Sequence, residues 1–277
     1  MKVIIIGKSG QLANELVAEV PAGIEILSLG RNDVDITSYF EVSNVVNEFN
    51  PTVIINASAY TAVDKAETDI AAAYLMNKTA VEIMAKVAKE NSSRFLHVST
   101  DFVFDGNSNI AYEVTSETKP TGVYGASKLA GEEAVKEIYP ENSAIIRTSW
   151  VYSSFGNNFV KTMLRLMAEK EQLSVVADQI GCPTYAKGLA IFLWKLAEKE
   201  NIDPIYHWSD AGVASWYDFA VAIQSIGFEQ GLLENKIPIK AIPSSAYPTP
   251  AIRPNFSLLN NSASAEIVEP VYWREQL

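Results

Sequence analysis

Short apolar runs alternate with helical patterns through the first half of the chain. The apolar runs predict buried strands at Val3–Ile6, Ile24–Leu29, Thr52–Ala57, Phe95–Ser99 and Ser143–Thr148. The segments between them predict helices at about Gly10–Glu19, from a cap at Thr37 to Phe49, at Thr68–Asn91 and at Thr121–Ile138. Strands alternating with helices indicate parallel βαβ units, and the nearly continuous apolar character of these strands indicates a sheet covered on both faces. The sequence therefore predicts an α/β fold with a doubly wound parallel sheet.

The pattern loosens after Trp150. Helical patterns remain near Asn157–Lys170, Tyr185–Glu200 and Trp216–Ile226. Prolines interrupt the rest of this region, at Pro183, Pro204, Pro238, Pro243, Pro248, Pro250, Pro254 and Pro270. We interpret the C-terminal third as a smaller lobe that closes a cleft over the sheet. The predicted first domain covers residues 1–149 and also 171–208, and the predicted smaller lobe covers 150–170 and 209–277.

Composition narrows the class of partner. The 277 residues include 22 basic and 33 acidic side chains, for a net charge of −11, which argues against nucleic acid or anionic lipid as the main partner. No stretch approaches the ~20 apolar residues that span a bilayer. A single cysteine, Cys182, suits a reducing cytoplasm, and two histidines are too few for a zinc site of several His and Cys ligands. We expect a cytoplasmic protein with no metal whose chemistry uses hydroxyls, a lysine, carboxylates or a cofactor.

The first strand is followed by a glycine turn of the pattern Gly-x-x-Gly-x-x-Ala. Gly7 suits a tight turn, Gly10 lets the backbone approach a pyrophosphate, and Ala13 lets helix and strand pack closely. The helix N-terminus then offers free N–H groups to phosphates. An ordinary strand–helix turn is the alternative for this short motif taken alone. In its context, the turn predicts a Rossmann-like dinucleotide site, so residues 1–149 become a dinucleotide-binding domain.

The end of the second strand bears on the choice of dinucleotide. Gly30 and Arg31 stand near the position where a carboxylate would bind the ribose 2′-hydroxyl of NAD. They leave space and a positive charge for a 2′-phosphate, which favours NADPH. Asp33 and Asp35 are close enough to keep NADH as the alternative, and Arg31 is as readily explained as a solvated surface cation.

Tyr124 and Lys128 stand at positions i and i+4 of a predicted helix, and so on one face of it. A free phenol has a pKa of about 10, and a nearby ammonium group is expected to lower that pKa and activate the phenol. Thr100 follows a predicted strand, where doubly wound folds place reactive groups, and its hydroxyl can orient a substrate carbonyl. The alternative interpretation is that Tyr124 and Lys128 are two surface residues of the helix and that the Thr100 side chain caps a loop. Together with the glycine turn, this set predicts catalysis by Thr100, Tyr124 and Lys128.

In these motifs the chain resembles the extended short-chain dehydrogenase/reductases, and within them the reductases that act on dTDP-4-dehydro-L-rhamnose. The resemblance covers nearly the whole chain, through the blocks Gly7–Ala13, Asn56–Glu67, Ser99–Gly106, Tyr124–Lys128, Arg147–Trp150, Asp178–Thr184, Ser215–Ala220 and Pro250–Pro254. It implies reduction of the C4 keto group of dTDP-4-dehydro-L-rhamnose to dTDP-L-rhamnose with NADPH, or alternatively NADH. Such an enzyme serves polysaccharide synthesis, for a cell wall or a lipopolysaccharide O-antigen.

The resemblance also implies roles for particular residues. Besides Gly7, Gly10, Arg31, Tyr124 and Lys128, the implied cofactor-binding residues are Gln11 and Leu12 at the pyrophosphate, Asp35 and Ile36 at the adenine end, Ser58, Ala59 and Tyr60 at the ribose and diphosphate, and Val98. The implied substrate contacts are Val63, Thr100, Asp101 and Trp150. We add Arg253 as a candidate for the dTDP diphosphate, with a structural salt bridge as the equal alternative.

Other activities fit the residues less well or stay open. A related dehydratase would need a carboxylate base after Thr100-Asp101, where Phe102 stands. A non-catalytic, NADP-binding regulatory subunit, resembling the β subunit of eukaryotic methionine adenosyltransferase, remains the alternative from another class. The resemblance suggests a homodimer. Some relatives bind Mg²⁺, and Glu15 matches one such ligand, but the sequence offers no full ligand set and we predict no metal.

Overall fold

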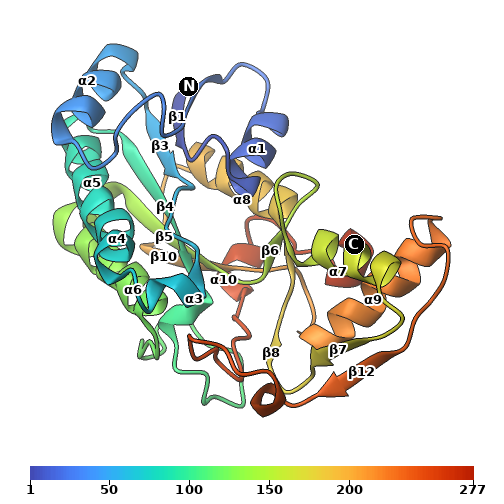
Figure 1. The fold of residues 1–277 in the computed structure, drawn as a ribbon. Helices are drawn as coiled ribbons and strands as arrows, with labels where there is room; N and C mark the ends of the chain where they lie inside the picture. Colours follow the sequence, from blue (N-terminus) through green and yellow to red (C-terminus); the bar gives the residue numbers. More distant parts are fainter.

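A six-stranded parallel sheet forms the centre of the computed structural model, which describes all 277 residues (Figure 1). Its strands lie in the order β2-β1-β3-β4-β5-β10, and their bounds are Glu25–Leu29, Lys2–Ile6, Val53–Asn56, Arg94–Thr100, Ser143–Thr148 and Ile205–Trp208. Every neighbouring pair runs parallel. The predicted doubly wound α/β fold is confirmed.

Helices cover both faces of this sheet (Figure 1). One face packs against α2 (Tyr39–Phe49), α5 (Ala80–Glu90) and α6 (Val123–Ile138), and the other packs against α1 (Gln11–Ala18) and α8 (Ala186–Glu198). Each face has its own core, of 18 and 19 buried hydrophobic residues respectively. Because both faces are covered, the strands carry apolar side chains on both sides, which produced the continuous apolar runs of the sequence.

The strand order reverses between β1 and β3, and this reversal positions the site. The chain passes from β1 outward to β2 and returns through α2 to β3 on the other side of β1. The segments that leave β1 and β3 therefore diverge beyond the carboxyl ends of the strands. In open α/β sheets ligands bind in the crevice that this divergence creates.

A second group of elements lies beside the sheet, to the right in Figure 1. It includes α7 (Phe159–Glu169) and α9 (Trp216–Glu229), which pack on β7 (Leu173–Val176) and its parallel partner β12 (Ile239–Ile242) around a third core of 12 buried residues. Two-residue strands form two further pairs: β8 (Ile180–Gly181) with β11 (Ala214–Ser215), and β6 (Val151–Tyr152) with β9 (Thr184–Tyr185). The domain boundaries drawn from the sequence stay a prediction.

No helix of the chain combines the length and apolar character needed to cross a membrane. The remaining helices are short. They are α3 (Val63–Ala66), α4 (Ile70–Tyr74), the π-helix η1 (Leu75–Thr79), the 3₁₀ turns η2 (Asp101–Val103), η3 (Pro140–Asn142) and η4 (Ser244–Ala246), α10 (Ser262–Ala265) and α11 (Trp273–Gln276).

The structure corrects the sequence prediction at three places. Helix α2 is capped by Ser38, whose hydroxyl accepts from the Glu41 N–H, while the Thr37 hydroxyl donates to a carboxylate oxygen of Asp35. The long helix predicted over Thr68–Asn91 is divided among α4, η1 and α5. Strand β10 was not predicted, because its four residues include a histidine and follow a proline.

Candidate active site

A cavity of about 1090 Å³ opens at the carboxyl ends of the central strands. It gathers every sequence-predicted site residue except Arg253. The residues concerned are Gly7, Gly10, Gln11, Leu12, Arg31, Asp35, Ile36, Ser58, Ala59, Tyr60, Val63, Val98, Thr100, Asp101, Tyr124, Lys128 and Trp150. Since these residues come from segments more than a hundred positions apart, the fold brings the predicted cofactor and catalytic residues into one space.

The glycine turn forms one wall of this cavity at the switch point. Gly7 has a φ of 113°, and a Cβ at this residue would lie 3.0 Å from the backbone of Ala57 and Ser58. The turns after β1 and β3 therefore approach too closely for any side chain at Gly7. Gly10 is the N-cap of α1 and supplies no side chain to the helix terminus. Gln11 and Leu12, the first residues of α1, line the cavity, so the helix N-terminus that suits an anionic pyrophosphate borders it.

The end of β2 presents one cation to the same cavity. Arg31 is exposed at the cavity rim. The carboxylate of Asp33 accepts from the Gly30 N–H at 2.9 Å, and that of Asp35 accepts from the backbone and hydroxyl of Thr37 at 2.9 and 2.7 Å. These hydrogen bonds, foremost the one from Gly30, lower the pKa of Asp33, and those from Thr37 lower the pKa of Asp35. Both carboxylates stabilise their own turns, which leaves Arg31 as the side chain free to meet a ribose phosphate.

The segment after β3 is held in place by two buried asparagines. Asn56 Oδ1 accepts from the N–H of Ser58 at 3.0 Å and from its hydroxyl at 2.7 Å. Asn77, in the π-helix, accepts from the Tyr60 N–H at 2.8 Å and donates to the Tyr60 carbonyl at 3.1 Å. The Asn77 amide also donates to Ser127 Oγ at 3.0 Å. Asn77 thereby ties the predicted ribose-binding segment to the helix that carries Tyr124 and Lys128.

The catalytic candidates meet where β4 ends and α6 begins. Thr100 is the last residue of β4, and its hydroxyl donates to Asp101 Oδ1 at 3.0 Å and accepts from the Phe102 N–H at 3.2 Å. Tyr124 lies in the first turn of α6, and its ring packs edge-on against Phe102 at 5.5 Å. Lys128 is buried one turn later, where Nζ donates to the carbonyl of Val98 at 2.7 Å.

The environment of Tyr124 and Lys128 differs from what the sequence predicted. Burial raises the pKa of Tyr124 to about 12, against the opposing effect of a hydrogen bond with Thr100. Burial also lowers the pKa of Lys128 to about 8. The expectation that Lys128 lowers the pKa of Tyr124 is wrong, because the amine is directed to the Val98 carbonyl and both groups are desolvated. The phenol is protonated at neutral pH, which suits a proton donor.

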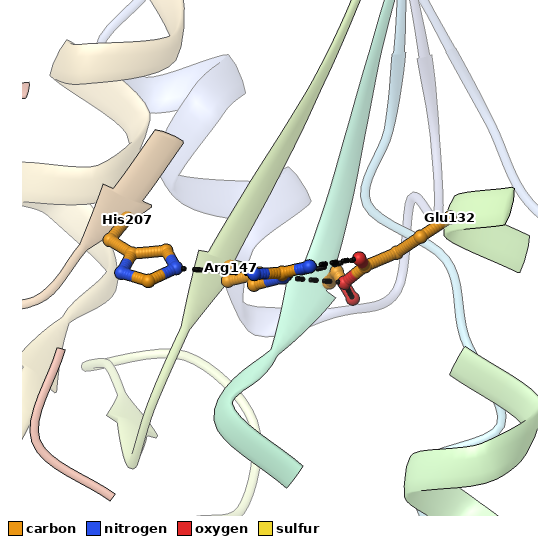
Figure 2. A network of polar contacts seen from close by, with 4 residues as sticks. Glu132, Arg147 and His207 are labelled. Atoms are coloured by element: carbon orange, nitrogen blue, oxygen red, sulfur yellow. Dashed lines mark hydrogen bonds and ion pairs between the residues drawn. The ribbon is translucent and has the colours of Figure 1, made fainter. Parts of the chain in front are cut away.

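A buried polar network supports α6 behind the cavity (Figure 2). Arg147 of β5 donates through Nε and Nη2 to the Glu132 carboxylate, at 3.0 and 2.6 Å, while Ser99 Oγ donates to the same carboxylate at 2.6 Å. On its other side, Arg147 Nη1 lies 3.5 Å from His207 Nε2 of β10. Glu132 stands one helical turn beyond Lys128, so this network fixes the catalytic helix against three strands of the sheet.

The predicted substrate residues Val63, Thr100, Asp101 and Trp150 also line the cavity. Asp101 is buried with one carboxylate oxygen unpartnered, and burial raises its pKa to about 6. Trp150 has a φ of 46°, a strained value for a bulky residue, and its indole stacks on Trp216 at 3.6 Å between ring centroids. Arg253 does not line the cavity; it forms a two-point ion pair with Asp64, at 3.0 and 2.7 Å.

Several residues of the site were missed by sequence reasoning. Asn56, His97 and Asn77 act through tertiary contacts, and Glu132, although it stands four positions after Lys128, takes its role from its contacts with Arg147 and Ser99. The loop before α7 adds Gly156 and Asn157 to the cavity wall, and the neighbouring Asn158 amide donates to Gln11 Oε1 at 2.9 Å. A local signal was available at Asn56, an asparagine among the apolar residues of a predicted strand.

No group of three or more His, Cys, Asp or Glu side chains is placed to hold a metal ion. Glu15, which matches a Mg²⁺ ligand of some relatives, is buried and accepts a hydrogen bond from Ser153 Oγ at 2.6 Å. The expected absence of a metal stays a prediction.

A glycine turn and a Tyr–Lys pair line one cavity of a doubly wound sheet, an arrangement of the short-chain dehydrogenase/reductase type. The model of the RmlD substrate binding domain matches residues 1–277, and the chain belongs to that family. A dTDP-4-dehydrorhamnose reductase of Aggregatibacter actinomycetemcomitans is 41% identical over 285 residues, which cover 100% of this chain and 97% of the relative. The corresponding reductase of Escherichia coli K12 is 41% identical, over 94% of this chain and 89% of the relative.

Solved structures agree with the sequence comparison. The crystal structure of a dTDP-4-dehydrorhamnose reductase from Bacillus anthracis, in complex with NADP, superposes with a TM-score of 0.93 at 36% sequence identity. The alignment covers 99% of this chain and 96% of that chain. The similarity therefore includes the elements beside the central sheet as well as the sheet itself.

Proposed function

We propose that this chain reduces the C4 keto group of dTDP-4-dehydro-L-rhamnose to dTDP-L-rhamnose with NADPH. The observation that carries the proposal is that Thr100, Tyr124 and Lys128 line the same cavity as the glycine turn. Relatives that match nearly the whole chain bear the name of this reductase, and one of them was crystallised with NADP.

The residues of the cavity fit NADPH. The glycine turn and the free N–H groups of α1 would hold the pyrophosphate, and Arg31 would meet the 2′-phosphate. Ser58–Tyr60 would contact the ribose and diphosphate beside the turn, with Asp35 and Ile36 at the adenine end. When bound, the nicotinamide supplies the hydride that reduces the substrate carbonyl.

Residues of the chain itself donate the proton and stabilise the charge that its transfer leaves behind. With a pKa of about 12, the Tyr124 hydroxyl is protonated at neutral pH and can donate its proton to the C4 oxygen as hydride reaches the carbon. The Thr100 hydroxyl orients that oxygen from the end of β4. The Lys128 amine, once protonated, stabilises the phenolate left on Tyr124 and can hydrogen-bond the nicotinamide ribose.

On the substrate side, Val63, Asp101 and Trp150 would contact the sugar nucleotide. Arg253 remains our proposed ligand for the dTDP diphosphate. Its guanidinium is paired with Asp64, so this role requires the diphosphate to compete with or supplement that carboxylate. The neighbouring Val63 lines the cavity, which places the ion pair at its margin.

We also propose a cytoplasmic homodimer that does not bind nucleic acid or membranes. A net charge of −11 supports the absence of nucleic-acid and membrane binding, and the single buried cysteine supports the cytoplasm, while the homodimer rests on the resemblance to the family alone. The alternative function, a non-catalytic NADP-binding regulatory subunit, is disfavoured by the complete set of Thr100, Tyr124 and Lys128, which cofactor retention alone does not need.

The test follows NADPH absorbance in the presence of freshly generated dTDP-4-dehydro-L-rhamnose, with NADH and unreacted dTDP-glucose as controls. Oxidation of NADPH with formation of dTDP-L-rhamnose is expected. NADPH binding without oxidation, together with capture of a stoichiometric protein partner, would instead support the regulatory subunit.

A further inference from the structure

Three buried side chains connect the cofactor wall to the catalytic lysine. Asn56 ends β3, His97 lies in β4 and Lys128 lies in α6, and all three are at most 1% exposed. Asn56 Nδ2 lies 3.0 Å from His97 Nδ1, and His97 Nε2 lies 3.4 Å from Lys128 Nζ. Asn56 and His97 have no place in the mechanism derived above.

The backbone fixes the orientation of the Asn56 amide. The Ser58 N–H can only donate, and it lies 3.0 Å from Asn56 Oδ1. Exchanging the oxygen and nitrogen of the amide would set an NH₂ group against this donor. Asn56 Nδ2 therefore faces His97 and donates, so His97 Nδ1 must accept. A neutral imidazole that accepts at Nδ1 carries its proton on Nε2.

The second histidine provides an internal contrast. His207 Nδ1 lies 3.0 Å from the carbonyl of Tyr112, which only accepts, so His207 must carry its proton on Nδ1. Its Nε2 faces the Arg147 guanidinium, which only donates. Burial lowers the pKa of His97 well below its usual value, and burial lowers that of His207 to about 3. Both rings are neutral at pH 7, and their fixed partners require opposite tautomers.

The His97 tautomer acts on Lys128. An ammonium group has only donors, and two N–H donors facing each other repel, whereas a neutral amine offers a lone pair to the imidazole N–H. We propose that His97, held by Asn56 as the Nε2–H tautomer, is a positioning residue that donates to Lys128 Nζ and favours its neutral amine.

The surroundings of Lys128 are consistent with this role. The Val98 carbonyl accepts one amine hydrogen at 2.7 Å in either charge state. Burial lowers the pKa of Lys128 to about 8, while the Glu132 carboxylate raises it, an influence that the ion pair with Arg147 reduces. On the cavity side stand the phenol of Tyr124 and the carboxyl group of Asp101. The consequence for catalysis rests on the proposed function: in the reductase, His97 sets the pH at which Lys128 gains its proton.

The first test reads the tautomers directly and needs no substrate or cofactor. Long-range ¹H–¹⁵N correlation spectra of the full chain with ¹⁵N-labelled histidine contain two imidazoles, and the His97→Gln variant assigns them. We expect a protonated Nε2 in His97 and a protonated Nδ1 in His207 at neutral pH. A protonated Nδ1 in His97, whether in a neutral ring or an imidazolium, would overturn the proposal.

The second test follows the Lys128 amine through the pH dependence of its ¹³Cε resonance, which the Lys128→Met variant assigns. Removing the donor in His97→Leu should raise the Lys128 midpoint from near 8 by roughly one pH unit, whereas His97→Gln, whose amide can still donate to Lys128, should raise it less. His207→Gln is the matched control and should leave the midpoint unchanged. An unchanged or lower midpoint in His97→Leu would contradict the proposal. Neither spectrum depends on turnover, so failure of the reductase assay leaves this inference standing.

Discussion

Glu132 and Arg147 form a fully buried two-point ion pair, with a shortest N–O distance of 2.6 Å, one helical turn beyond Lys128 (Figure 2). Ser99 adds a hydrogen bond to the carboxylate, and the Phe104 ring lies under the guanidinium, 5.1 Å from its central carbon. The pair therefore couples α6 to strands β4 and β5. Its loss affects both stability and the placement of the catalytic helix.

Removing one partner should destabilise the fold strongly. Arg147→Met leaves the Glu132 charge buried without a counterion, which costs about 3–5 kcal/mol of unfolding free energy. Replacing both residues, as Glu132→Gln with Arg147→Met, should recover a large part of this loss, because no isolated charge remains. Urea unfolding of the two single variants and the double variant measures the coupling. Additive losses would show that the two side chains do not act as a pair.

Tyr124→Phe should separate catalysis from cofactor binding. The variant loses the acidic hydroxyl but keeps the ring that packs on Phe102, so we expect kcat to fall by at least about 10²-fold. NADPH affinity, measured by fluorescence titration, should stay close to that of the unmodified chain. Near-normal turnover would exclude Tyr124 as the proton donor.

Arg31→Ala should distinguish the two nicotinamide cofactors. A charge-assisted contact with the 2′-phosphate contributes about 1.5–3 kcal/mol, so the Kd for NADPH should rise by roughly 10- to 100-fold. The Kd for NADH should change little. Lys2→Ala is a matched control, since it removes a surface cation at the opposite end of β1. Equal effects of Arg31→Ala on both cofactors would remove the basis for the NADPH preference.

Lys128 should make stability depend on pH. Its pKa is about 8 in the folded chain and 10.5 in the unfolded chain, so the unfolded chain binds the extra proton between these values. The unfolding free energy should therefore rise with pH across this interval, by on the order of 3 kcal/mol, relative to Lys128→Met. Below pH 8 the folded chain bears the cost of the buried charge. Parallel stability curves for the two proteins from pH 8 to 10.5 would contradict the lowered pKa.

Patterns within single segments predicted much of this molecule. Continuous apolar runs located five of the six central strands, because a parallel sheet buried on both faces needs apolar residues at every position. The glycine turn and the Tyr–Lys pair were found because their spacing follows from one turn and one helix. The resulting cavity includes all but one of the predicted site residues.

The site residues that the sequence did not predict take their roles from contacts between distant segments. The contact between the π-helix η1 and α6 is an example. The backbone carbonyl oxygen of Asn77 would lie 2.1 Å from a Cβ on Gly131, so α6 can approach η1 only at a glycine. Neither residue indicates this contact by itself. The partner of Arg253 was equally undetermined, since Asp64 is 189 positions away in the sequence. Residues such as Asn56 acquire a role only when the strands are assembled.

The proposed reaction transfers hydride from NADPH to C4 of the sugar while Tyr124 supplies the proton. The most direct measurement uses NADPH deuterated at the transferable position and dTDP-4-dehydro-L-rhamnose, with NMR analysis of the product. For the proposed reaction we expect dTDP-L-rhamnose carrying deuterium at C4, formed in proportion to the NADPH consumed. A product without deuterium at C4, or no consumption of bound NADPH, would contradict it.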